Sequence, residues 1–194
     1  LRIAPYSVYR EVRERCALFW GLTSRTMLRD EARAFLTAGG RIEAGDMMLR
    51  MLRVALPGVA TTDSGVGRVD GQALALLHAV GAFQAFRRAV PAPPNALPVT
   101  RFLLFERAYP DSVAAAVDAV QESLVLADAN PRNSEPVLRL SRLSADLEFR
   151  RRSDGSDDLP ALCETVQREL ASAEQDIADR YFAGAASAPG IVTT

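Results

Sequence analysis

Apolar positions along the chain recur mainly at intervals of three and four residues, and strand-like alternation is scarce. This period places the apolar side chains on one face of an α-helix. A seam of this kind lets one helix lie along others, so the chain is predicted to be all-α, an antiparallel helical bundle of about six or seven helices. The clearest run lies within residues 30–56, where seven apolar or small residues follow these steps without a break: Phe35, Ala38, Ile42, Gly45, Leu49, Leu52 and Leu56.

Other segments show the same period or carry helix start signals. The first predicted helix, residues 7–22, has Tyr9, Val12, Cys16 and Phe19 on one face. Asp111 or Ser112, Asn133 or Ser134, and Asp158 followed by Pro160 are typical helix starts, and the prolines of 91–98 predict a stiff crossover. The remaining predicted helices cover residues 71–90, 102–105, 112–124, 133–151 and 158–182.

No composition shift or linker divides the predicted helices into two cores. We therefore expect residues 1–182 to form a single helical domain and residues 183–194 to be a disordered tail. Residues 57–70 lack periodicity and are expected to form a mobile connection. The sequence has no signal-like apolar run and no stretch that fits a membrane span, so the expected location is cytoplasmic.

The charged residues exclude several classes of chemistry. All 23 basic residues are arginines, which leaves no lysine for a P-loop or a Schiff base. His78 is the single histidine, and Cys16 and Cys163 lie far apart without a CxxC motif. Neither a metal nor a cofactor is expected, and both cysteines are predicted to be small buried residues. A net charge of −1 argues against nucleic acid as a partner.

Charge gathers beside the apolar seam of the second predicted helix. At 100° per residue Glu43 and Arg50 lie within about 20° of each other, and Asp46 stands four residues before Arg50. One interpretation is a carboxylate site held by an arginine; the other is a solvated face or an ion network between packed helices, which the spacing alone favours. The candidate functional face comprises Arg29, Asp30, Glu31, Glu43, Asp46 and Arg50.

Glycine is unusual inside a helix, because each glycine costs about 1 kcal/mol relative to alanine. The second predicted helix contains Gly39, Gly40 and Gly45. The close approach of another helix or of a ligand would explain them, and so would a local kink at Gly39 and Gly40.

The same helix carries a family resemblance. Its motifs are Met27-Leu28-Arg29-Asp30-Glu31, Phe35-Leu36, Gly39, Glu43, Asp46 and Arg50-Met51-Leu52, and Arg180-Tyr181-Phe182 closes the series. In their order they resemble the bacterial alpha-E family of helical proteins, over about residues 6–182. Members of that family are longer, which implies that this chain corresponds to their C-terminal portion. Where the family usually has two arginines, this chain has Gly40 and Ala44.

The resemblance implies a role rather than a reaction. Genes of the family commonly neighbour those of circularly permuted ATP-grasp ligases and transglutaminase-like proteases, which suggests a part in making or modifying peptide-like amides. The first hypothesis is therefore an accessory protein whose candidate face serves or docks on such a ligase. The second is a stand-alone enzyme that uses Glu43, Asp46 and Arg50 on an amine or peptide. The third is a purely structural interaction module.

Overall fold

The computed structural model describes residues 5–56, 66–153 and 158–183. Within these ranges the chain is helical and has no strand, which confirms the all-α prediction. A 3₁₀ turn, η1 (Pro131–Asn133), precedes α7, and a π-helical turn, η2 (Ala178–Phe182), continues α8. The α-helices are α1 (Pro5–Thr26), α2 (Glu31–Ala55), α3 (Val66–Ala79), α4 (Phe83–Ala89), α5 (Ala96–Phe105), α6 (Val113–Ala127), α7 (Glu135–Arg152) and α8 (Leu159–Ile177).

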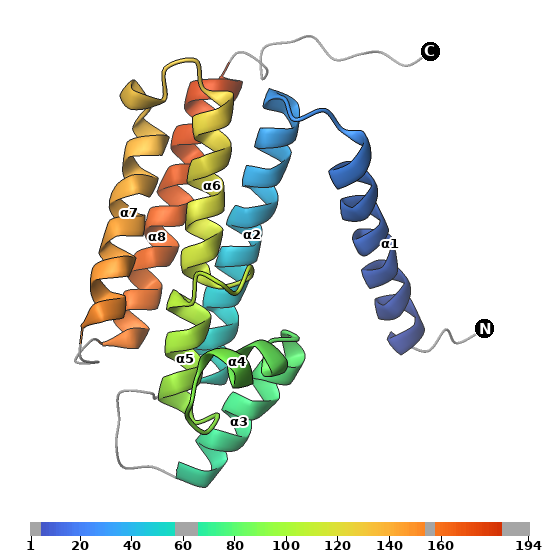
Figure 1. Ribbon diagram of the computed structural model, residues 1–194, viewed down its shortest axis with the longest axis vertical. Helices are drawn as coiled ribbons and strands as arrows, with labels where there is room; N and C mark the ends of the chain where they lie inside the picture. Colours follow the sequence, from blue (N-terminus) through green and yellow to red (C-terminus); the bar gives the residue numbers. More distant parts are fainter. Residues whose placement is uncertain (1–4, 57–65, 154–157, 184–194) are drawn as a thin grey trace.

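Four of these helices form the bundle. In it α2 packs on α6 and α8, and α7 packs on the same two helices from the other side. Figure 1 shows that neighbours in this ring run in opposite directions, so the bundle is antiparallel as predicted. The short helices α3, α4 and α5 gather at the end where α2 finishes.

The predicted seam of α2 forms a large part of the core. Leu49 is fully buried, and Ala38, Leu52 and Leu56 are almost fully buried. Burial of such side chains is the main favourable term in folding. The prediction is wrong for Phe35 and Ile42, which are only partly buried, because both line a groove between α2 and α8.

The predicted helix over residues 71–90 is wrong in one respect, because it is two helices. Gly81 has a φ of +70° and ends α3, a conformation that residues with a side chain rarely adopt. The stiff crossover predicted over residues 91–98 is shorter than expected. Helix α5 begins at Ala96 and takes Pro98 into its first turn, where a backbone N–H is not needed.

The helix starts largely follow the predicted signals. The side chains of Asp30, Ser112 and Asp158 each accept a hydrogen bond from the backbone N–H three residues later, which caps α2, α6 and α8. Ser134 precedes α7 as expected but does not cap it with its side chain. Its hydroxyl lies 3.0 Å from the hydroxyl of Tyr181 instead.

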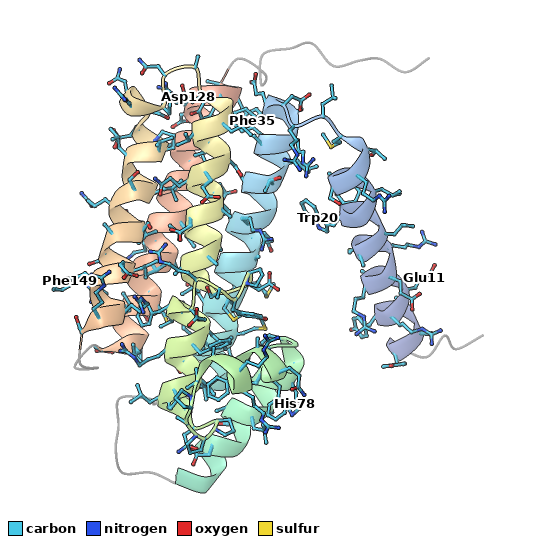
Figure 2. The ribbon with its side chains drawn as sticks, viewed as in Figure 1. Glu11, Trp20, Phe35, His78, Asp128 and Phe149 are labelled. Carbon is cyan, nitrogen blue, oxygen red and sulfur yellow. The ribbon has the colours of Figure 1, made fainter. Side chains whose placement is uncertain are left out.

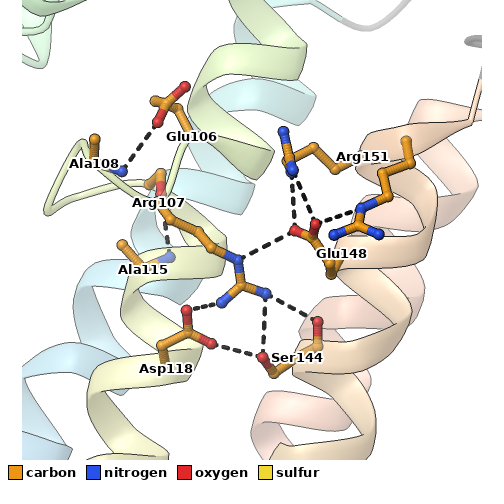
Figure 3. Close-up of polar contacts among 10 residues, drawn as sticks. Glu106, Arg107, Ala108, Ala115, Asp118, Ser144, Glu148 and Arg151 are labelled. Carbon is orange, nitrogen blue, oxygen red and sulfur yellow. Dashed lines mark hydrogen bonds and ion pairs between the residues drawn. The ribbon is translucent and has the colours of Figure 1, made fainter.

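An ion network joins the loop after α5 to α6 and α7 (Figure 3). The Arg107 guanidinium pairs with Asp118 of α6 and lies 3.4 Å from Glu148 of α7, and it donates to the Ser144 hydroxyl at 3.2 Å. Hydrogen bonds from Arg151 above all lower the pKa of Glu148 to about 2. Because Arg107 bonds to residues of both α6 and α7, this network fastens the two helices to the loop after α5.

Helix α1 stands apart from the bundle and is joined to it near the start of α2 (Figure 1). Its predicted apolar face is exposed, including Tyr9, Val12 and Phe19. The prediction that both cysteines are buried is therefore wrong for Cys16 and confirmed for Cys163. Burial raises the pKa of the Cys163 thiol to about 11, so this sulfur stays protonated at neutral pH.

The predicted connection over residues 57–70 is wrong for residues 66–70, because α3 begins at Val66. The rest of that connection, and residues 184–194 of the disordered tail predicted over 183–194, fall outside the described residues. Among the helices that the structure describes, none has both the length and the apolar character to cross a membrane.

Candidate functional site

The candidate site is a groove of about 480 Å³ between α2 and α8. Its floor is apolar and is formed largely by Phe35, Ala38 and Ile42 of α2 together with Leu170 and Ile177 of α8. Its rim is polar and carries Glu43, Asp46, Arg50, Gln167 and Glu174. An apolar floor with a few polar groups at the rim is typical of a site for a small molecule or a short segment of peptide.

Asp46 is the most constrained of the rim carboxylates, and its side chain is 19% exposed. One oxygen, Oδ2, lies 2.6 Å from Nε of Arg50, and the other accepts a hydrogen bond of 2.6 Å from Nε2 of Gln167. The predicted ion pair of Asp46 and Arg50 is thus present. Because both carboxylate oxygens are engaged, Asp46 is a positioning group that ties the rim of α2 to α8.

Gln167 extends this link across the two helices. Its Oε1 accepts a hydrogen bond of 2.7 Å from Nη1 of Arg53, and Nη2 of Arg53 lies 3.3 Å from Glu164. Asp46, Gln167 and Arg53 therefore form one continuous polar chain along the α2–α8 boundary. Such a chain holds the spacing of the groove walls.

Two further carboxylates remain open to a ligand. The side chains of Glu43 and Glu174 line the groove from opposite helices and are exposed. Among the described residues, neither side chain makes a hydrogen bond or an ion pair. In the same ranges no group of three or more histidine, cysteine or carboxylate side chains is arranged to hold a metal ion. The open carboxylates therefore favour an organic cation or a hydrogen-bond donor.

The remaining candidate residues lie elsewhere. Arg29, Asp30 and Glu31 stand at the start of α2, about 20 Å along the helix axis from Glu43. Asp30 caps the helix, and its carboxylate accepts from the backbone N–H of Arg33 at 3.2 Å. The structure therefore brings Glu43, Asp46 and Arg50 together in the groove and leaves the other three outside it.

Aromatic rings close one end of the groove. The ring of Phe35 lies 4.9 Å from that of Tyr181 and 5.2 Å from that of Phe182, measured between centroids. These rings come from α2 and η2, so they join the first part of α2 to the turn that continues α8. Edge and tilted ring contacts of this kind add to the stability of the apolar end.

An ion pair between the shielded carboxylate of Asp128 and the exposed Arg180 holds η2 in this position. Asp128, just after α6, accepts from Nε of Arg180 at 2.8 Å and also from the hydroxyl of Tyr181. Hydrogen bonding from Arg180 above all keeps the pKa of Asp128 well below its usual range. The pKa of the Tyr181 hydroxyl is raised, first by burial and then by its bond to Asp128. Figure 2 places Asp128 at the same end of the bundle as Phe35.

The three glycines of α2 have different surroundings. A Cβ on Gly40 would lie 2.7 Å from the ring of Trp20, so this glycine admits the close approach of α1. A Cβ on Gly45 would meet Ala116 and Leu170 at 3.4 Å, in the packed interior. A Cβ on Gly39 would enter open space in the groove. The helix continues through Gly39 and Gly40, so close approach, and not a kink, explains Gly40 and Gly45.

The positions that depart from the family pattern lie away from the groove. Gly40 and Ala44 both line a second cleft, between α1 and α2. Arg41, which follows Gly40, forms an ion pair with Asp111 at 3.2 Å. The departures therefore change the α1 side of α2 and leave the rim of the groove intact.

Sequence reasoning missed the half of the site that α8 provides. Gln167, Leu170 and Glu174 follow a spacing of three and four, which places them on one face of α8. The spacing alone predicts that these three residues share a face. It does not predict that this face lies across a groove from Glu43. Asp128 was also missed, because its partners are 52 and 53 residues away in the sequence.

Comparison with known families agrees with the resemblance. The model of the Alpha-E family, described as "A predicted alpha-helical domain with a conserved ER motif", matches residues 2–182. The chain belongs to the Alpha-E family. No curated protein and no solved structure matches the chain. Within the matched range, Glu-Arg pairs stand at Glu14-Arg15 of α1 and at Glu106-Arg107, where Arg107 is the centre of the network in Figure 3.

Proposed function

We propose that this Alpha-E chain is an accessory binding protein that holds an amine-bearing, peptide-like compound for an ATP-grasp-type ligase. The observation that carries the proposal is the α2–α8 groove, where two carboxylates with no ion pair among the described residues, Glu43 and Glu174, lie beside an apolar floor. An ammonium group pairs with the carboxylates while an aliphatic side chain covers the floor. The lack of lysine in the sequence supports ATP chemistry on the partner rather than on this chain.

The stand-alone enzyme is the weaker alternative. Carboxylates that act as general acids or bases are typically those whose pKa is shifted by burial or by a neighbouring charge. Glu43 is exposed, Asp46 has both oxygens engaged, and the groove contains neither a histidine nor a cysteine. These features favour binding over catalysis. The third hypothesis, a purely structural module, is supported by the polar chain of Asp46, Gln167 and Arg53, but it gives the open carboxylates no role.

A pair of simple probes tests the binding site. Calorimetric titration with n-hexylamine and with hexanoate presents the same apolar body with opposite charge. We expect the amine to bind at least about tenfold more tightly, a difference of about 1.4 kcal/mol. Glu43→Gln and Glu174→Gln should each weaken binding of the amine, whereas Glu31→Gln, on the same helix but outside the groove, should leave it unchanged. Equal binding of both probes, or binding of neither, would contradict the proposal.

A second experiment tests the partner. The chain is co-expressed with an ATP-grasp ligase of the kind whose genes the resemblance places beside those of the family, and a tag on the ligase is used for purification. We expect the chain to co-purify, and the groove variants to retain the complex while lowering ligation of an amine substrate. Lack of association would refute the accessory role even if hexylamine binds. If Glu43→Gln only lowers the melting temperature, the structural module is the correct description.

A further inference from the structure

Arg50 is the one basic side chain among the described residues that line the α2–α8 groove. Its Nε lies 2.6 Å from Oδ2 of Asp46, and the other oxygen of Asp46 is bonded to Gln167. Within the part of the chain that the structure describes, Nη1 and Nη2 of Arg50 make neither a hydrogen bond nor an ion pair. The Arg50 side chain is 64% exposed, so these two nitrogens are open to a ligand.

The open edge of this guanidinium suits a carboxylate. Two N–H groups side by side in a planar fork match the two oxygens of a carboxylate, which is why arginine is the usual partner of that group. The bond from Nε to Asp46 restrains the guanidinium and leaves the Nη1 and Nη2 edge unused. Arg139, by contrast, spends Nε on Asp176 and Nη1 on Glu169. Arg50 is therefore anchored at the rim of a groove and still able to bind an anion.

The open carboxylates of the groove lie at a defined distance from Arg50. Glu43 precedes it by seven residues, or two turns of α2, so both side chains leave one face of the helix about 10 Å apart along its axis. The bond between Asp46 and Gln167 sets the level of the antiparallel α8, and Glu174 is two turns beyond Gln167. Both open carboxylates thus lie toward the aromatic end of the groove, and Arg50 lies at the other end.

We propose that the groove recognises a zwitterionic segment of about three residues, with its ammonium group at Glu43 and Glu174 and a carboxylate at Arg50. This inference rests on the proposed function and adds to it a second recognised group, a length and a direction. An extended chain rises about 3.3–3.6 Å per residue, so three residues span about 10 Å. An apolar side chain on the first residue then covers the floor that Ile42 and Leu170 form.

A diamine is the main competing guest. It would place one ammonium group at Glu43 and another at Glu174, since both side chains are exposed. It would leave the open edge of Arg50 without an anion, whereas the zwitterion uses all three charged groups. Charge complementarity along the whole groove therefore favours the zwitterion.

The carboxylate of the guest can come from two sources, the C-terminus of a tripeptide or an acidic side chain of a longer peptide. Calorimetric titration with leucyl-alanyl-alanine and with its C-terminal amide tests the shared chemistry. We expect the free acid to bind at least about fivefold more tightly than the amide, and added salt to reduce the difference. Free leucine should show no such preference over leucinamide, because its two charges are too close together to reach both ends of the groove.

A third peptide distinguishes the two sources. The C-terminal amide of leucyl-alanyl-aspartate carries its carboxylate on the side chain of the third residue. If it binds as tightly as free leucyl-alanyl-alanine, Arg50 accepts a side-chain carboxylate as well. If it binds as weakly as the tripeptide amide, Arg50 is specific for the C-terminus.

Variants of Arg50 test whether this residue reads the carboxylate. Arg50→Gln should abolish the preference for the acid over the amide, while n-hexylamine binds at least as tightly as before because Asp46 loses its positive partner. Arg50→Lys should keep part of the preference, since it retains the charge but not the fork. The matched control is Arg29→Gln, an exposed arginine just before the same helix and outside the groove, which should keep the preference in full. A change in stability alone does not alter this ratio, because both ligands are measured on the same variant.

Three results would overturn the inference and leave the proposed function standing, as long as hexylamine still binds more tightly than hexanoate. One is equal binding of the tripeptide acid and its amide, and another is a preference that survives Arg50→Gln. The third is binding of 1,6-diaminohexane at least about fivefold tighter than hexylamine while the tripeptide acid binds more weakly than its amide, which would assign the groove to a dication. If hexylamine itself does not bind, the proposed function fails and this inference fails with it.

Discussion

Helices α1 and α2 are the two longest helices of the chain, and both were predicted from the same spacing of apolar residues. The seam of α2 lies against α6 and α8 and contains the fully buried Leu49. The corresponding face of α1 is exposed at Tyr9 and Phe19. Equal periodicity thus leads to opposite burial. The pattern predicts that a helix has an apolar side, but whether the side is covered depends on what other helices are present to cover it.

The sharpest test of this contrast is truncation within the α2 seam. Leu49→Ala should lower the free energy of unfolding by about 2–5 kcal/mol, because it removes buried methyl groups and leaves a cavity. Urea denaturation measures the change. The control is Val54→Ala on the same helix, where the side chain is 82% exposed and the expected change is within about 0.5 kcal/mol. A Leu49→Ala cost under about 1 kcal/mol would contradict the bundle assignment.

A carboxylate of the bundle, Asp128, and a carboxylate of α1, Glu11, extend the comparison from apolar side chains to ion pairs. Asp128→Asn should cost about 1–3 kcal/mol at pH 7, because the Asp128 side chain, which is 5% exposed, binds Arg180 and Tyr181. The matched variant Glu11→Gln removes an exposed pair with Arg15 on α1 and should cost less than about 0.5 kcal/mol. Denaturation curves at one ionic strength measure both; equal costs would contradict the difference in burial.

The Asp128 effect has a defined pH dependence. Its folded pKa lies below the unfolded value of about 3.9, so the stabilisation is complete above about pH 4 and is lost as the pH falls toward the folded pKa. The stability gap between wild type and Asp128→Asn should therefore be constant from about pH 5 to 7 and should shrink below about pH 4. A gap that persists unchanged in acid would show that the carboxylate charge is not responsible.

Neighbouring glycines of α2 distinguish its two faces. Gly39→Ala should raise the free energy of unfolding by about 0.5–1 kcal/mol, because the new Cβ enters open space and alanine favours the helix. Gly40→Ala has the same propensity gain but displaces Trp20. We expect a smaller gain and Trp20 emission at longer wavelength for Gly40→Ala alone. Identical emission in the two variants would mean that α1 does not rest on α2.

The smallest expected effect is on α1 itself. Phe19→Ala removes an aromatic ring, yet in the isolated chain it should change the free energy of unfolding by no more than about 0.5 kcal/mol, because the ring is half exposed. Thermal denaturation beside Leu49→Ala makes the comparison direct. A loss above about 2 kcal/mol would show that α1 already packs against a partner surface in solution.

The sequence predicted which segments are helical better than it predicted which helices pack against each other. The helix class, the α2 seam apart from Phe35 and Ile42, and the caps at Asp30, Ser112 and Asp158 all depend on residues close together in the chain, and these predictions are confirmed. The break at Gly81 was missed, because a single glycine is compatible with both a helix interior and a helix end.

The candidate site was half predicted for the same reason. Asp46 and Arg50 are one helical turn apart, so their ion pair could be read from spacing. Gln167 meets Asp46 across 121 residues, and only the packing of α8 on α2 brings them together. Arg29 and Glu31 were grouped with Glu43 because they share a helix, although the length of that helix separates them.

The ring cluster of Phe35, Tyr181 and Phe182 makes the two ends of the groove different. One end is closed by aromatic rings, whereas Arg50 at the other end is largely exposed. Under the proposed function, the apolar part of a bound guest would therefore lie nearer the rings, and its polar part nearer Glu43, Asp46 and Arg50.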